Sequence, residues 1–140
     1  MDTLKEQQAE NYLKEAGLSL DAAKAIFEKA KEEDKNLWAN VVKCCYDAVE
    51  QAVSAVLAKK GEIIPKEHPE KIKKLINLYS IEKTIERQLF YWLRRRSSSQ
   101  YVDIKDGLLC VPHELFSEED AGNCLEDSEE IIEYIRQMIE

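Results

Sequence analysis

The chain has 140 residues, of which 44% are hydrophobic and 34% charged, and its formal net charge is −8. This length favours one domain, residues 1–140, with a core that needs no disulfide or structural metal. The acidic charge argues against a general nucleic-acid-binding surface but leaves room for a small basic cleft. No apolar run approaches the ~18 residues of a membrane span, and MDTLKEQQAE lacks the apolar core of a signal peptide. We therefore expect a cytoplasmic protein without membrane contact.

The first half of the chain predicts two long helices, and the low counts of glycine (4) and proline (3) favour few, long elements. Apolar residues recur at helical spacing over 4–30, preceded by Thr3, which forms a capping box with Glu6. A second helix is expected over 37–60, with Gly61 as its αL cap. One face of this helix consists mainly of Ala and Val, so another backbone can approach it closely.

Two shorter helical patterns follow. Pro69 suits the first position of a short helix, and Ser80 is expected to cap the next one. Apolar residues of that next helix recur over 81–93, and three arginines follow the pattern.

The last part of the chain begins with an irregular segment, 97–116. It predicts either two short strands around Asp106-Gly107, a hairpin-compatible turn, or an ordered loop. Ser117 is expected to cap a final helix over 118–139. The sum predicts an all-α fold, an antiparallel up-and-down four-helix bundle with one additional short helix.

Cysteine and glycine patterns indicate neither a metal nor a cofactor. The sequence holds no CxxC, no HExxH and no EF-hand loop, and its glycines are too scattered for a phosphate loop. Cys45 and Cys124 fall on apolar stripes, where reduced cysteines behave as small core residues. We expect no metal site and no cofactor.

His68 and His113 are the only histidines, so any histidine chemistry must use one of them. His68 precedes Pro69 at a helix start, where it either orders the loop or acts as a ligand or catalytic group. His113 follows Pro112 in the irregular segment, and we expect it to be exposed. Both are secondary site candidates, and the spacing designates no base for a Ser or Cys nucleophile.

The sharpest local charge is the arginine triplet at the end of the fourth helical pattern. One interpretation is a solvated helix end, because cations oppose the negative pole of the helix dipole. The other is a phosphate-contacting edge, because a guanidinium grips two oxygens at once, and hydroxyls, an amide and an aromatic ring follow it. The candidate nucleotide- or RNA-binding residues are Arg94, Arg95, Arg96, Ser99, Gln100 and Tyr101.

Over nearly its whole length the chain resembles the HEPN domains of bacteria and archaea. The resemblance rests on the order and spacing of five segments: AENYLKEAGLSLDAAKAIFEKA, CCYDAVEQAVSAVLAKKG, KEHPEKIKKLI, RRRSSSQYVD and EEDAGNCLEDSEEIIEYI. It implies a small helical bundle, a homodimer and a minimal nucleotidyltransferase as a partner protein.

Active members of that family are metal-independent ribonucleases that pair an Arg with a His four to six residues further on. In this chain the corresponding windows after the arginine triplet contain residues from Ser99 to Asp103 and no histidine. Tyr101 falls in these windows, but a tyrosine is a poor base at neutral pH. The departure predicts that the chain is not an enzyme of this type, so no catalytic residue is assigned.

The leading hypothesis is a non-catalytic homodimer that binds a nucleotide, an RNA end or a partner nucleotidyltransferase in an arginine-rich cleft. Its dimer surface would come from the Ala/Val face of the second helix or from the last helices. One alternative is an endoribonuclease toxin of a toxin–antitoxin pair. The other is a helical adaptor with no nucleotide site.

Overall fold

The computed structural model describes residues 3–139. The described residues form three long helices, α1, α2 and α6, and several shorter elements. In chain order the elements are α1 (Thr3–Glu33), α2 (Trp38–Lys59), α3 (His68–Leu78), α4 (Lys83–Arg95), the 3-10 turn η1 (Ser97–Ser99), β1 (Asp103–Lys105), β2 (Leu108–Cys110), α5 (Pro112–Leu115) and α6 (Glu118–Ile139).

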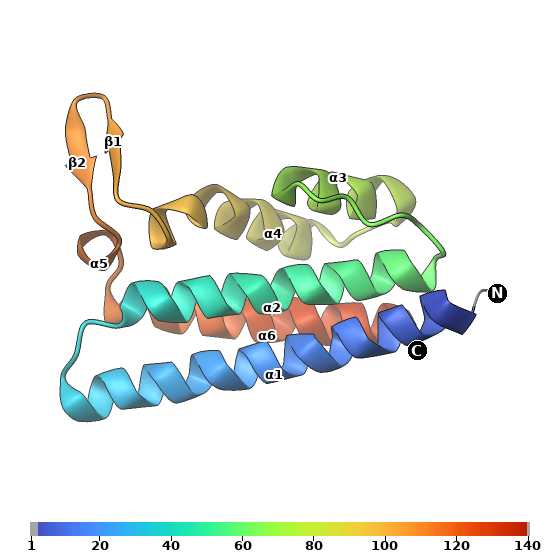
Figure 1. The fold of residues 1–140 in the computed structure, drawn as a ribbon, viewed down its shortest axis with the longest axis horizontal. Coiled ribbons are helices and arrows are strands. Elements are labelled where there is room, and N and C mark those ends of the chain that lie inside the picture. The colour runs from blue at the N-terminus through green and yellow to red at the C-terminus, as the bar shows by residue number, and fades with distance from the viewer. Residues whose placement is uncertain (1–2, 140) are drawn as a thin grey trace.

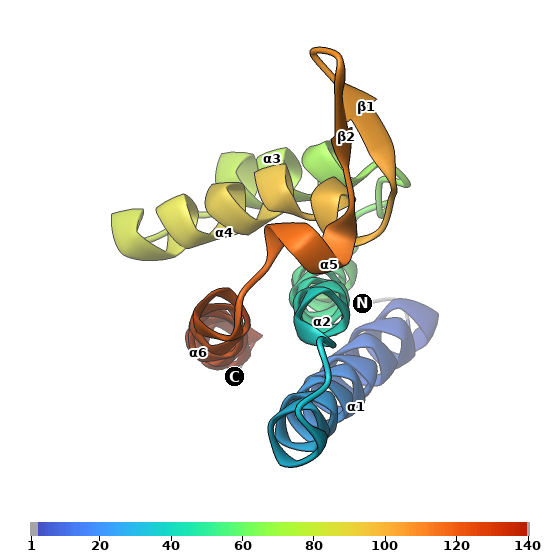
Figure 2. The same ribbon diagram turned by 90° about the vertical axis from the view of Figure 1, so that its left-hand side faces the viewer.

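The helices form two layers. The long helices α1, α2 and α6 lie lengthwise beside one another, and α3 and α4 cover one side of them (Figure 1). In the end-on view α1, α2 and α6 run toward the reader, whereas α3 and α4 lie across them (Figure 2). The all-α class is confirmed, and α4, the fourth main helix, packs obliquely on the other three.

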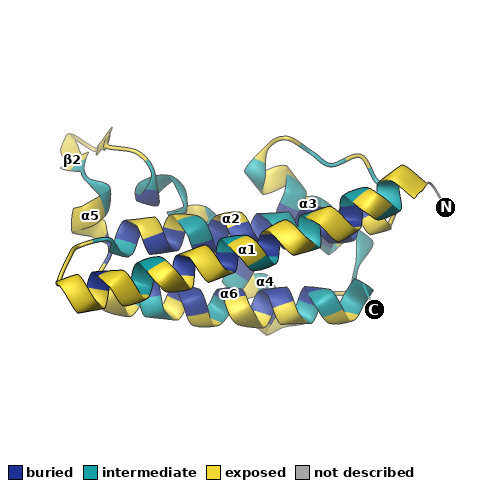
Figure 3. Ribbon diagram, turned by 60° about the horizontal axis from the view of Figure 1, so that its bottom comes forward, coloured by how far each residue is buried: buried dark blue, intermediate teal, exposed yellow. Residues whose placement is uncertain are grey.

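The helix α2 is the centre of the core. Its alanine and valine side chains are almost completely buried, as Val42 (0% exposed) and Ala52 (0%) illustrate, whereas α1 and α6 show exposed outer faces (Figure 3). Small side chains let α1 and α6 approach the α2 backbone closely, as the sequence predicts. Because this face is filled within one chain, it is not free to form a dimer surface.

Helix ends mostly follow the predicted capping residues. At the end of α2, Gly61 has φ +83°, its amide donates to Ala58 O, and the Glu62 amide donates to Leu57 O. This is a Schellman motif. At the start of α6, Ser117 Oγ accepts from the Asp120 amide, as expected of an N-cap.

The predicted cap at Ser80 is wrong, because α4 begins at Lys83 with Glu82 as its N-cap residue. The chain stays extended at Tyr79 and Glu82, and Ile81 packs against the core. The Glu82 amide donates to the hydroxyl of Tyr134 on α6. A tertiary contact therefore replaces the local cap.

The irregular segment contains a hairpin, the first of its two predicted forms. The strands β1 and β2 pair antiparallel, with Lys105 opposite Leu108, and Asp106 and Gly107 both have positive φ, as a two-residue turn requires. The hairpin projects from the bundle (Figures 1 and 2).

Two further expectations concern cysteines and membranes. Cys45 and Cys124 are fully buried, as predicted, and all four cysteines are free. Within residues 3–139, no helix is long and apolar enough to cross a membrane.

Candidate functional site

The three adjacent arginines point into different surroundings. Arg94 is exposed and lines an open groove of about 870 Å³ between α4 and α6. Phe90, Tyr91 and Trp92 contribute aromatic surface to this groove, and Asp127 on its α6 side accepts a 2.8 Å hydrogen bond from Trp92 Nε1.

Arg95 is a structural clamp between α4 and α6. Its guanidinium lies 4.5 Å from the centre of the Phe116 ring, forms a 3.2 Å ion pair with Asp120 and donates to Leu115 O. Tyr91 Oη accepts a further hydrogen bond from it. With these donors in use, Arg95 is poorly placed to receive a ligand.

Arg96 continues the inward-facing side of α4, which carries Ile85, Leu89 and Trp92. It is half-buried, and its Nε atom is fully buried without a hydrogen-bond partner in the described chain. The charge of Arg96 acts on Tyr46 and Asp47 of α2. It is thus separated from Arg94 and faces the central helix.

The residues after the arginines also diverge. Ser99 is buried, and its hydroxyl donates to Arg96 O, 2.6 Å away, so it closes the η1 turn. Gln100 is half-buried, and Tyr101 is 56% exposed at the base of the hairpin. The structure therefore does not gather the six predicted residues into one cleft within a single chain.

A polar cluster lies beside Arg96, where α2 meets the start of α3. Its centre is Glu50, whose side chain is only 9% exposed. One carboxylate oxygen forms a short hydrogen bond with His68 Nδ1, and the other accepts from Lys71 Nζ at 3.0 Å. We use the name polar cluster for Tyr46, Asp47, Glu50, His68, Lys71 and Arg96.

Within the polar cluster, Tyr46 interacts with both His68 and Arg96. Its ring lies edge-on to the His68 ring, with centroids 6.4 Å apart. Its hydroxyl is buried and completes no hydrogen bond of good geometry in the described chain. Burial raises the pKa of Tyr46, the Glu50 carboxylate raises it further, and the Arg96 guanidinium opposes them.

Asp47 lies at the outer edge of the polar cluster. Burial raises the pKa of Asp47, and the positive charges of Lys43, Arg96 and His68 act against that rise. His68 and Arg96, from different helices, thus both act on this one carboxylate. A hollow of about 160 Å³ adjoins the cluster, lined by Tyr12, Asp47, Glu50, Gln51, Ser54 and Lys71.

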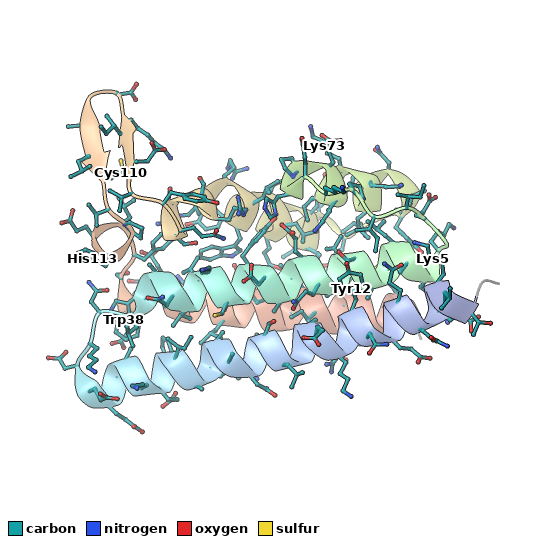
Figure 4. The ribbon with its side chains drawn as sticks, in the orientation of Figure 1. Lys5, Tyr12, Trp38, Lys73, Cys110 and His113 are labelled. Carbon is teal, nitrogen blue, oxygen red and sulfur yellow. The ribbon has the colours of Figure 1, made fainter. Side chains whose placement is uncertain are left out.

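His113 is far from this cluster. It is exposed on α5. In Figure 4, His113 lies at the opposite end of the molecule from α3, which can be located by the label of Lys73. Within residues 3–139, no three His, Cys, Asp or Glu side chains come together as metal ligands.

Sequence reasoning proposed His68 and Arg96 separately and missed Tyr46, Glu50 and Lys71. A signal was present for Glu50, because it follows Tyr46 by four residues and precedes Val53 by three on an otherwise apolar face. A charged residue at such a position needs a buried partner. The sequence does not show which partner, because the loop after α2 decides where α3 begins.

A family model and a solved structure both match this chain. Residues 7–138 match the family model of the HEPN domain. The fold is similar to the crystal structure of ST0689, an archaeal HEPN homologue, with a TM-score of 0.71 and 20% identity. That match covers 94% of this chain and 98% of the other. No curated protein matches the sequence.

Proposed function

This chain belongs to the HEPN family, and from that premise we propose that it is a non-catalytic module that binds a nucleotide or an RNA end. The phosphate contact is Arg96, at the inner edge of the polar cluster. The observation that carries this proposal is the buried Nε of Arg96, which has no hydrogen-bond partner in the described chain.

The physical argument starts from the cost of burying a guanidinium. A buried donor without an acceptor is unfavourable by about 1–3 kcal/mol, and more when the group is charged. Arg96 forms no ion pair with a described residue, in contrast to Arg95. A phosphate that reaches the accessible part of this half-buried side chain compensates the charge of Arg96, and a guanidinium matches phosphate geometry well.

The non-catalytic part of the proposal rests on the sequence after the arginines. The position where active family members carry a histidine is occupied here by residues such as Ser99, whose hydroxyl is engaged with Arg96 O. A homodimer and a nucleotidyltransferase partner belong to the same proposal and rest on the family resemblance.

A binding experiment tests the function. AMP and a short oligoribonucleotide are titrated by calorimetry into the wild-type protein and into Arg96→Gln. We expect Arg96→Gln to weaken binding at least about tenfold, because a hydrogen bond to a charged group contributes about 1.5–3 kcal/mol. Arg94→Gln is the matched control, since Arg94 is exposed on the other side of α4, and its affinity should stay within about twofold.

Two results would contradict the proposal. Equal affinity of the wild type and Arg96→Gln would remove Arg96 from the site, and no binding by the wild type would favour a helical adaptor. Metal-independent cleavage of labelled RNA, lost in Arg96→Gln, would instead support the endoribonuclease alternative.

A further inference from the structure

The hairpin formed by β1 and β2 has one apolar face. Successive side chains of a strand point to opposite faces, and Ile104 is paired with Leu109, so these two side chains share a face. Val102 and Val111, which flank the two strands, continue the same alternation. We call these four residues the hairpin face. Ile104 is 71% exposed, Val102 66% and Leu109 65%. An exposed apolar surface of this kind is typical of an interaction site.

The hairpin is better suited to docking by this face than by its strand edges. The Asp103 carboxylate accepts a 2.8 Å hydrogen bond from the Ile104 amide. Since this amide is used within β1, it is not free to pair with an added strand. The other strand, β2, has only three residues. The hairpin face therefore needs a hollow with apolar surface as its partner.

The groove between α4 and α6 offers such a surface. It has a volume of about 870 Å³, and Phe90, Tyr91 and Trp92 contribute its aromatic part. Tyr91 is 42% exposed, so its ring is accessible to an apolar partner. None of the hairpin residues lines this groove, and the hairpin projects away from its own bundle (Figures 1 and 2). The groove is thus open to the hairpin of another copy.

The charges of the groove and of the hairpin are complementary. The groove presents three exposed charges without an ion pair in the described chain, two cations and one anion: Arg87, Arg94 and Glu126. Its other charged side chains are engaged within the chain: Lys83 with Glu86, Asp120 with Arg95 and Asp127 with Trp92. The hairpin presents the reverse, two exposed anions and one cation: Asp103, Asp106 and Lys105. Opposite charges on two surfaces favour their pairing and fix its register.

We propose that two copies of this chain form a dimer in which the hairpin face of each copy docks in the α4/α6 groove of the other. A two-fold axis produces both contacts at once, because each copy carries both complementary surfaces. This inference rests on the homodimer in the proposed function and gives that homodimer an interface. The nucleotide contact at Arg96 does not depend on it.

The area of the two contacts agrees with a dimer of moderate affinity. Burying an aliphatic side chain removes roughly 100 Å² of apolar surface from water, so docking the three exposed residues of the hairpin face covers roughly 300 Å². The groove loses a similar area, and the contact occurs twice. The total is on the order of 1,200 Å², the lower limit of stable protein interfaces. The dimer should therefore dissociate on dilution.

Sedimentation velocity over a series of protein concentrations measures the dimer dissociation constant. We expect Ile104→Glu in the hairpin and Arg87→Glu in the groove each to raise it at least about tenfold. Ile63 is 80% exposed outside both surfaces, and Ile63→Glu is the control for Ile104→Glu. Lys14 on α1 is exposed as well, and Lys14→Glu is the control for Arg87→Glu. Both controls should stay within about twofold of the wild type.

A mixture of the two weakened variants tests the exchange itself. Ile104→Glu retains an intact groove and Arg87→Glu an intact hairpin face, so a mixed dimer contains one intact contact. A homodimer of either variant contains none. The mixture should therefore dimerise more strongly than either variant alone, which also demonstrates that both variants are folded. A mixture no stronger than its components would overturn the exchange of hairpins.

The remaining outcomes separate this inference from the proposed function. A dimer that Ile104→Glu leaves unchanged would show that the interface is elsewhere, and the proposed homodimer would stand. A wild type that stays monomeric at every concentration would contradict both the interface and the homodimer. In either case the titration of Arg96→Gln with AMP still decides the nucleotide contact.

Discussion

Glu50 joins α2 to α3, because its carboxylate binds two side chains of α3. It lies among apolar α2 residues, and such a carboxylate is stable in the interior only when paired and hydrogen-bonded. His68 and Lys71, one helical turn apart on α3, supply both partners. A pair of donors at this spacing is a local feature of α3, but its use depends on where α3 packs.

Backbone conformation at Gly61 provides a prediction for a single residue. Gly61 has φ +83°, and an added Cβ would meet no atom within 4 Å. Gly61→Ala should therefore lower the free energy of unfolding by about 1–2 kcal/mol through backbone strain alone, as measured by urea unfolding.

Gly122 in α6 is the matched control for Gly61. It has no positive φ, and an added Cβ would lie 3.8 Å from the Phe27 ring, an ordinary contact. Gly122→Ala should raise stability by about 0.5–1 kcal/mol, because alanine restricts the unfolded chain. The same sign for both variants would contradict the conformational explanation.

At the scale of elements, α3 and α6 show how a short and a long helix are stabilised in different ways. An isolated helix of 11 residues such as α3 is marginal in water, so Ile72 and Leu75, both buried, and the pairing with Glu50 hold it in place. The longer α6 adds a local device at its start, where Asp120 bonds to the Ser117 amide at 2.9 Å and pairs with Arg95.

This device predicts a pH dependence. Burial by itself raises the pKa of Asp120, but the bonds from Ser117 and Arg95 outweigh it and the net pKa is lowered. A carboxyl with a lowered folded-state pKa stabilises the fold above its unfolded pKa, and this contribution is lost as the pH falls through the folded value. Asp120→Asn should thus be less stable than the wild type at pH 7, with a gap that closes below about pH 4.

Thermal unfolding between pH 3 and 7 measures this gap. Glu119→Gln, an exposed change in the same helical turn, should show a much smaller gap. A gap for Asp120→Asn that stays constant with pH would contradict the role of its charge.

At the scale of the whole molecule, the buried core stabilises the fold, whereas the exposed hairpin does not. The core is continuous around α2, whereas the hairpin side chains are exposed, with Ile104 at 71% and Leu108 at 69%. A two-stranded hairpin of this size is not stable alone in water. Its exposed apolar side chains therefore add no stability to the bundle within one chain.

Replacing Val102, Ile104, Leu108 and Leu109 by threonine should therefore change the free energy of unfolding of the monomer by less than about 0.5 kcal/mol. Leu57→Ala, a change at a fully buried position, should cost about 2–5 kcal/mol because it leaves a cavity. Urea unfolding at low protein concentration compares the two. A large loss for the hairpin variant would show that the hairpin supports the core.

Much of the fold could be predicted because its information is local. Apolar periodicity predicts α1, α2 and α6. Gly61 predicts the end of α2, Ser117 the start of α6, and Asp106-Gly107 the hairpin turn. The predicted cap at Ser80 was wrong because the hydroxyl of Tyr134, distant in sequence, accepts a hydrogen bond from the Glu82 amide instead. Of the site candidates, His68 and Arg96 lie in the polar cluster, but Tyr46, Glu50 and Lys71 carried too weak a local signal.

The sequence by itself determined the all-α class, the spans of the long helices α1, α2 and α6 and the small-residue face of α2, because these depend on spacing along the chain. Only the tertiary structure decided which charged groups meet. Adjacent arginines point about 100° apart around a helix, so Arg94 faces a groove, Arg95 clamps α6 and Arg96 faces α2. Likewise, the packing of α3 on α2 places His68 on Glu50, since pairs distant in sequence are fixed by packing and not by spacing.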